Sequence, residues 1–154
     1  MQLYIQWHQP IILDDGDEEN LIYTVANLDV LDEVSGVYMF CRKYSEKYIP
    51  LYIGKSINIY KRITQHLNST KMMRSIQKSL SGEKVLIIGE YTPKSGQDLD
   101  KSIKIIEKTL IEHALAEGYE LINISGTKTK VHQICFKGFQ GAKKFSGPIM
   151  YRKE

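Results

Sequence analysis

The sequence predicts an α/β (α+β) fold in which helices flank a small, mostly antiparallel, three-stranded central sheet. Two runs rich in β-forming residues, 37–44 and 48–53, are separated by a polar stretch, as in an antiparallel hairpin. A third apolar run, 84–91, precedes a long helical pattern at about 98–117. A chain of 154 residues is long enough for one such domain with a substantial core.

The first 35 residues give weaker signals. Leu3 to Trp7 is a candidate strand, residues 14–20 predict a polar, acidic loop, and residues 21–32 fit either strand or helix. We expect the apolar side chains of this segment to pack against the core. They are Leu3, Ile5, Trp7, Ile11, Ile12 and Leu13.

Two short amphipathic helices follow the hairpin, and Gly54 ends its second strand. Ser56 is the predicted N-cap of the first helix, which runs to about residue 67. Its apolar stripe is Ile59, Ile63 and Leu67. The second helix covers about 71–80 and is predicted to bury Met72, Met73, Ile76 and Leu80.

The long third helix carries its own start and stop signals. Asp98 or Asp100 can cap it, and Gly118 can stop it. Its predicted core stripe is Leu99, Ile103, Ile106 and Leu110. Beyond residue 123 the chain predicts loops and short strands.

Charge is distributed unevenly along the chain. Residues 1–35 hold eight acidic side chains and no Lys or Arg, whereas residues 36–123 sum to +5 and residues 124–154 to +6. We therefore expect an acidic N-terminal extension (1–35) packed on the core, a central domain (36–123) and a basic C-terminal extension (124–154). The basic parts can attract phosphates, although an unevenly charged, solvated surface would give the same pattern.

Several classes of protein are excluded by the bulk sequence. No stretch is long and apolar enough to span a bilayer, and residues 1–10 lack the pattern of a signal peptide. The two cysteines cannot build a disulfide framework or a cysteine-rich zinc site. We expect an intracellular protein, cytoplasmic or, in a eukaryote, nuclear, with no membrane partner; the sequence does not indicate an oligomeric state.

Polar side chains are expected to converge where the hairpin meets the first helix. Tyr52 lies near the end of the second strand, and Lys55 and Ser56 stand at the helix N-terminus, whose free N–H groups attract anions. Arg62 and His66, four residues apart, share one face of that helix. Arginine binds phosphate in a bidentate manner, and a tyrosine whose pKa is lowered by cations can act as base or nucleophile.

Each of these residues has an ordinary explanation when taken alone. The chain has ten tyrosines, so Tyr38 and Tyr52 fit common strand aromatics, and Arg62 and His66 fit the surface of an amphipathic helix. Their order, spacing and local structure together favour a phosphate-handling site.

At this point the sequence resembles a known family. Gly36-Val37-Tyr38, Tyr52-Ile53-Gly54-Lys55-Ser56, and then Asn58, Arg62 and His66 are similar to the motif of GIY-YIG nucleases. The resemblance covers about residues 36–123, which would then be the GIY-YIG nuclease domain, and implies a GIY-YIG-like fold. It also implies a catalytic glutamate on the long helix and a closing asparagine, here Asn123.

Two glutamates fit the catalytic position. We favour Glu112, because its distance to Asn123 is closer to that in the family, and we keep Glu107 as the alternative. The two are five residues apart, about 140° around a helix, so only one can face the site. The resemblance implies one metal ion, Mg²⁺ or Mn²⁺, and Mg²⁺ is satisfied by one carboxylate, phosphate oxygens and water.

The resulting hypothesis is a metal-dependent endonuclease that hydrolyses DNA, duplex or branched. Tyr52 acts as the base, Arg62 stabilises the transition state, and the glutamate holds the metal. Tyr38 and His66 assist them. The residues expected to bind substrate or support the site are Lys55, Ser56, Asn58 and Asn123. The alternative is a non-catalytic nucleic-acid-binding module in a repair or recombination complex.

Overall fold

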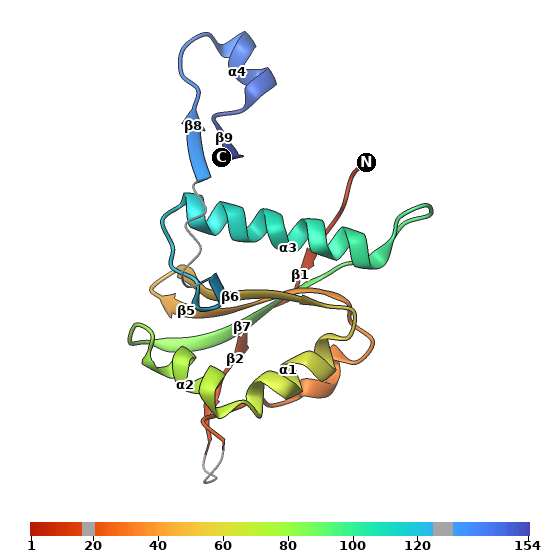
Figure 1. The fold of residues 1–154 in the computed structure, drawn as a ribbon, viewed down its shortest axis with the longest axis vertical. Coiled ribbons are helices and arrows are strands. Elements are labelled where there is room, and N and C mark those ends of the chain that lie inside the picture. The colour runs from red at the N-terminus through yellow and green to blue at the C-terminus, as the bar shows by residue number, and fades with distance from the viewer. Residues whose placement is uncertain (17–20, 125–130) are drawn as a thin grey trace.

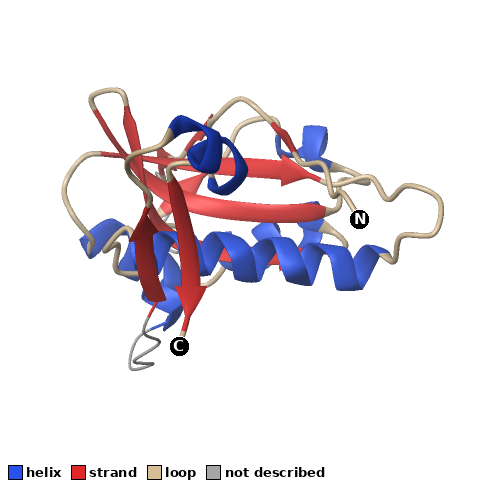
Figure 2. Ribbon diagram, turned by 90° about the horizontal axis from the view of Figure 1, so that it is seen from above, coloured by secondary structure: helices blue, strands red, loops and turns tan. Residues whose placement is uncertain are grey.

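The computed structural model describes residues 1–16, 21–124 and 131–154. It has an antiparallel sheet covered by helices on both faces (Figures 1 and 2). At its centre lies β5 (Gly36–Tyr44), which pairs with β6 (Lys47–Ser56) on one side and β7 (Glu83–Glu90) on the other. The predicted mixed α and β fold with an antiparallel sheet is therefore confirmed.

The sheet has five strands instead of the predicted three. Two short N-terminal strands, β1 (Gln6–Trp7) and β2 (Ile11–Ile12), pair with the free edge of β7. The order is thus β1-β7-β5-β6, with β2 also on β7. Covering β7 satisfies backbone groups that an exposed edge would leave unpaired. In contrast, β6 forms the other edge of the sheet.

The helices divide between the two faces. On one face lie α1 (Ile59–Leu67) and α2 (Thr70–Lys78), which pack on a core that includes Tyr38, Phe40 and Leu86. On the opposite face lies α3 (Leu99–Ala116), which packs on β6 through a second cluster around Ile53. Figure 1 shows α3 crossing the sheet on the side opposite α1 and α2. No described helix is long and apolar enough to cross a membrane.

The remaining elements are short. A two-stranded ribbon, β3 (Asp14–Asp15) with β4 (Tyr23–Thr24), borders the acidic segment, and 3₁₀ turns cover Leu28–Leu31 and Ile122–Ile124. Within the predicted acidic loop at 14–20, residues 17–20 lie outside the described part of the chain, as do residues 125–130 of the C-terminal extension. The rest of that extension forms β8 (Val131–Cys135), α4 (Gln140–Ser146) and β9 (Ile149–Lys153).

Three local predictions were wrong. Ser56 is the last residue of β6, paired with Gly36, so the helix begins later and its N-cap is Asn58, whose side chain accepts from the Lys61 N–H. Gly54 lies inside the strand and does not end it. Leu80, expected in the core, is 57% exposed because α2 ends at Lys78.

Candidate functional site

An aromatic cluster occupies the face of the sheet beneath α1. The Tyr38 hydroxyl and His66 Nε2 share a buried hydrogen bond of 2.7 Å. The ring of Tyr52 stacks on that of Tyr38, with centroids 6.2 Å apart, and meets the His66 ring edge-on at 5.3 Å. The hairpin and the first helix therefore bring together Tyr38, Tyr52 and His66.

Gly54 makes this cluster possible. It pairs with Tyr38 across β5 and β6. A Cβ atom on residue 54 would lie 2.4 Å from the Tyr38 hydroxyl oxygen and 2.5 Å from Cζ, closer than real contacts allow. The glycine of Tyr52-Ile53-Gly54 thus opens space for the Tyr38 ring, a role that a turn-based interpretation of the motif misses.

Burial sets the protonation of the inner pair. Burial, followed by the positive charge of Arg62, lowers the pKa of His66 to about 4. Burial also raises the pKa of Tyr38, and the neighbouring Arg62 offsets only part of that rise. At neutral pH the hydrogen bond therefore joins a neutral imidazole to a neutral phenol.

Arg62 supplies a permanent positive charge beside the two tyrosines. It lies on the exposed side of α1, where its Nη1 donates to Gln65 Oε1 at 3.2 Å. Its interaction with the Tyr38 hydroxyl raises the guanidinium pKa, and Tyr52 acts in the same direction. The guanidinium therefore interacts electrostatically with both tyrosines while its side chain stays exposed and accessible to a ligand.

The turn from β6 into α1 is held by its own side chains. The Ser56 hydroxyl donates to the Asn58 carbonyl at 2.8 Å and accepts from the Asn58 N–H at 3.0 Å. Because Asn58 also caps the helix, both residues shape the turn between Lys55 and Arg62. Their expected role in substrate binding stays a prediction.

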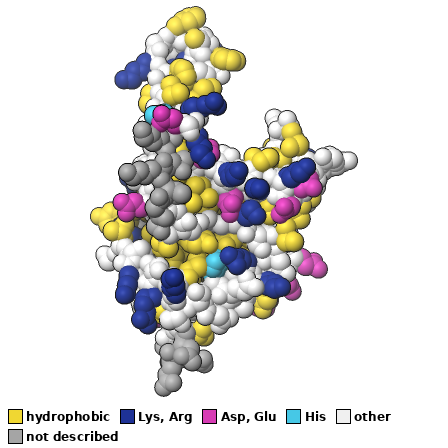
Figure 3. Space-filling model, viewed as in Figure 1, with side chains coloured by type: hydrophobic (Ala, Val, Ile, Leu, Met, Phe, Trp, Pro, Cys, Tyr) yellow, Lys and Arg dark blue, Asp and Glu magenta, His cyan; other side chains and the backbone are white. Residues whose placement is uncertain are grey.

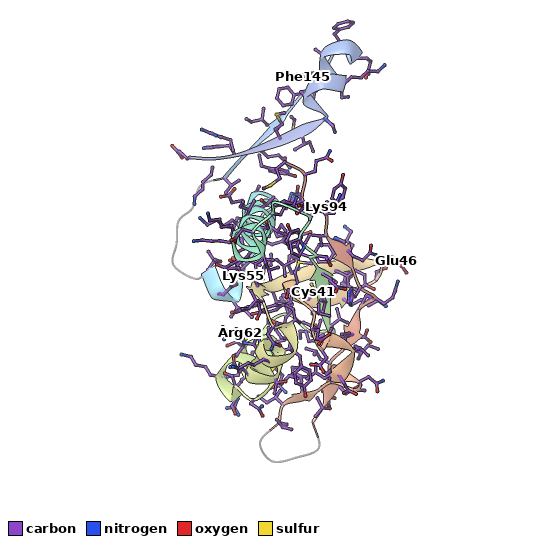
Figure 4. All side chains as sticks on the ribbon, turned by 90° about the vertical axis from the view of Figure 1, so that its right-hand side faces the viewer. Cys41, Glu46, Lys55, Arg62, Lys94 and Phe145 are labelled. Carbon is purple, nitrogen blue, oxygen red and sulfur yellow. The ribbon has the colours of Figure 1, made fainter. Side chains whose placement is uncertain are left out.

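On the other face of the sheet, α3 packs against β6. Glu107 lies four and seven residues before Ile111 and Ala114, which pack on Ile53, so it shares the helix face turned to the sheet. Burial raises the pKa of Glu107, whereas the positive charges of Lys55, Lys104 and Lys108 oppose the rise. Figure 4 shows Lys55 between α3 and α1, the helix that bears Arg62.

Glu112 faces a different neighbour. Its carboxylate lies 4.0 Å from the Lys153 ammonium of β9. Both glutamates border an open hollow of about 300 Å³ between α3 and β9, and Glu107 also interacts with the positive charge of Lys55, on the strand that carries Tyr52. The two glutamates therefore have different charged neighbours, and the choice of metal ligand between them stays a prediction.

Asn123 ties the segment after α3 to the same strand. Its amide Nδ2 donates to the Ile53 carbonyl at 2.8 Å, next to Tyr52 and Gly54. The amide thereby fixes the spacing between α3 and β6 at the site.

Figure 3 shows hydrophobic side chains in the band between α3 and the α1–α2 pair, with Lys and Arg side chains on both sides.

Comparison with known families agrees with this geometry. The model of the GIY-YIG catalytic domain matches residues 34–120, more than half of the chain. The chain belongs to the GIY-YIG family. The GIY-YIG catalytic domain is a nuclease domain, so the substrate class is nucleic acid, and nucleases of this family generally depend on a divalent metal ion. Comparisons with curated proteins and with solved structures give no significant match.

The donor set of this GIY-YIG domain fits a lightly ligated metal ion. In the described residues no group of three or more His, Cys, Asp or Glu side chains is placed to hold a metal. Glu107 offers one half-buried carboxylate beside Lys55. Mg²⁺ keeps several waters and accepts one or two carboxylates plus substrate phosphates, so a single carboxylate is sufficient.

Proposed function

We propose that the protein is a divalent-metal-dependent DNA endonuclease whose active site lies along the β6 edge. The observation that carries the proposal is the packed cluster of Tyr38, Tyr52 and His66, with Arg62 one turn before His66 on α1. A fixed guanidinium beside a phenol suits a pentavalent phosphate, on which negative charge increases during attack. Lys55 and Glu107 lie on the other side of the same strand.

The tyrosines have different surroundings, which suggests different roles. Tyr38 is 1% exposed and is bonded to His66, so it is suited to orient its neighbours and not to exchange protons with solvent. Tyr52 is half-buried at the rim of the cluster. In its deprotonated form the Tyr52 oxygen accepts a proton from the attacking water. The water oxygen bonds to phosphorus, the bond to the 3′-oxygen breaks, and that oxygen takes a proton from solvent.

The charged residues neutralise the phosphate during this step. Arg62 binds its non-bridging oxygens, and Lys55 contacts an adjacent phosphate. We assign the metal-binding role to Glu107 in place of Glu112, since Glu107 lies on the sheet-facing side of α3. A metal ion bound there would supply Lewis-acid stabilisation of the phosphate and the leaving oxygen. Asn123 acts as a positioning residue that holds β6 against the segment following α3.

Cleavage of supercoiled plasmid tests this proposal. We expect nicking in Mg²⁺ or Mn²⁺ that EDTA abolishes and that Tyr52→Phe reduces by at least about 10²-fold, the lower range for loss of a general base. Tyr48→Phe, an exposed tyrosine on the same strand, is the matched control and retains wild-type activity. Metal-independent nicking, or equal activity of the two variants, contradicts the proposal. DNA binding without any nicking would support the non-catalytic module instead.

A further inference from the structure

The C-terminal residues 131–154 form an arm attached to α3. In this arm β8 and β9 pair as a hairpin with α4 at its tip (Figure 1). The arm is anchored by Glu117, which accepts from the Tyr151 hydroxyl and, at 3.3 Å, from Gln133 Nε2. The rings of His113 and Tyr151 meet edge-on at 4.8 Å. The helix that bears Glu107 therefore also carries the arm.

Large aromatic side chains are exposed at the tip of the arm. Phe139 is 82% exposed and Phe145 is 91% exposed, more than any other aromatic side chain of the described chain. An open apolar hollow of about 400 Å³ lies between them, lined also by Phe136 and Met150. Figure 4 shows Phe145 near the top of the view, on the far side of α3 from Arg62. Exposed aromatic surface of this kind is typical of a binding site.

The charge around the hollow identifies its occupant. The arm, residues 131–154, holds five basic side chains and one acidic side chain, Glu154, for a net charge of +4; the basic residues are Lys137, Lys143, Lys144, Arg152 and Lys153. Lys137 and Lys143 line the hollow itself. A second copy of the arm would bring a further net charge of +4 to the same place, which disfavours self-association. A polyanion that also presents flat apolar surfaces fits both features.

We propose that the arm binds DNA by taking an unstacked base between Phe139 and Phe145, while the lysines contact the phosphates on either side. The inference rests on the proposed function, because it extends the DNA path of the same active site. Aromatic side chains stack on unpaired bases regardless of sequence, and lysines neutralise the backbone. The arm would thus select DNA that contains an unpaired or extrahelical base.

The reach of the arm limits where that base can lie. Glu117 is ten residues from Glu107, or about 15 Å along α3. Gln133, which donates to Glu117, is six residues from Phe139, or at most about 20 Å of extended chain. Phe139 therefore lies within about 35 Å of the carboxylate, or roughly ten base pairs at 3.4 Å each. We expect nicks to map within about one helical turn of the unpaired base.

The test uses the full-length protein in EDTA, which separates binding from cleavage. Fluorescence anisotropy compares a duplex with the same duplex bearing one bulged nucleotide, and 2-aminopurine at the bulge reports stacking. We expect tighter binding of the bulged DNA, and about tenfold weaker binding after Phe139→Ala with Phe145→Ala, as expected for loss of base stacking. Tyr4→Ala is the control, because it removes an exposed aromatic side chain near the N-terminus, outside the arm.

Charge variants test the second half of the proposal. Lys143→Gln with Lys144→Gln should weaken both DNAs equally and reduce the salt slope of log K by about 1.8. Wild-type affinity for bulged DNA in the double phenylalanine variant would overturn the proposal. A loss of binding to phosphatidylserine vesicles, or of dimer on a sizing column, with DNA binding unchanged, would also overturn it. Continued metal-dependent nicking of plasmid in these cases would leave the active-site proposal intact.

Discussion

Replacement of Gly54 by alanine tests how closely the site is packed. The new Cβ atom would lie 2.4 Å from the Tyr38 hydroxyl oxygen, about 1 Å less than an ordinary contact. The Tyr38 ring is 1% exposed and is held by Phe40, Tyr52 and His66, so it has little room to move away. A shift of about 1 Å would stretch its 2.7 Å bond to His66 beyond hydrogen-bonding distance.

The magnitude follows from these two effects. Overpacking costs about 1–3 kcal/mol and the lost hydrogen bond about 1 kcal/mol, so Gly54→Ala should lower the free energy of unfolding by about 2–4 kcal/mol. For a chain of this size that corresponds to a Tm lower by about 5–15 °C. Since Tyr38 is displaced by about 1 Å, the nicking rate should fall by about 10²-fold.

Thermal denaturation and plasmid nicking measure both effects. Gly96→Ala is the control, because a Cβ there would meet nothing within 4 Å and the change adds only the strain of a positive φ. It should lower stability by about 1 kcal/mol and leave nicking unchanged. A Gly54→Ala protein with the Tm and nicking rate of the wild type would refute the proposed packing of Tyr38.

Three further predictions concern the same cluster. Arg62→Ala should reduce the nicking rate by about 10²–10³-fold. Arg74→Ala on α2 is the control and should change the rate by less than about threefold, within the effect of one surface charge. Equal losses in the two variants would contradict the role of Arg62. Because the pKa of His66 is lowered in the folded protein, the imidazole of the unfolded chain takes up a proton at a higher pH than that of the folded chain. The contribution of His66 to the free energy of unfolding is therefore complete above about pH 6.5 and is lost as the pH falls towards 4. After allowance for solvent screening the loss is about 1–2 kcal/mol, and urea titrations should show it in the wild type and not in His66→Gln; the same slope in both proteins would exclude this origin. Asn123→Ala removes the bond to the Ile53 carbonyl and should cost about 1–3 kcal/mol, with a parallel fall in nicking; unchanged unfolding in urea would show that the bond contributes nothing.

Local patterns predicted most of the fold. The hairpin, both short helices and the long helix follow from side-chain periodicity and capping residues that act within a few positions of one another. Asp98, for example, caps α3 as its sequence position suggests, because its side chain accepts from the Lys101 N–H at 2.8 Å. The short N-terminal strands were only partly foreseen, since strands of two residues form through the free edge of β7 and not through their own propensity.

The sequence could not predict two features that depend on tertiary contacts, namely the strand pairing of Ser56 and the rotation of α3 about its own axis. Ser56 is a good N-cap by composition, but its pairing with Gly36 extends β6 and moves the cap to Asn58. The predicted stripe on α3 omitted Ile111 and Ala114, which pack against Ile53 in the structure. That rotation decides which glutamate faces the strand, and it depends on how the helix docks on the sheet.

Separate replacement of the two glutamates tests the account most directly. Nicking of supercoiled plasmid is measured across a Mg²⁺ titration for Glu107→Gln and Glu112→Gln, with binding in EDTA as a check on folding. We predict that Glu107→Gln loses at least about 10²-fold in rate at every Mg²⁺ concentration, while Glu112→Gln follows the wild-type curve. An inactive Glu112→Gln beside an active Glu107→Gln, or wild-type curves for both, would contradict an active site in which α3 presents Glu107 to Tyr52 and Arg62 across the β6 edge.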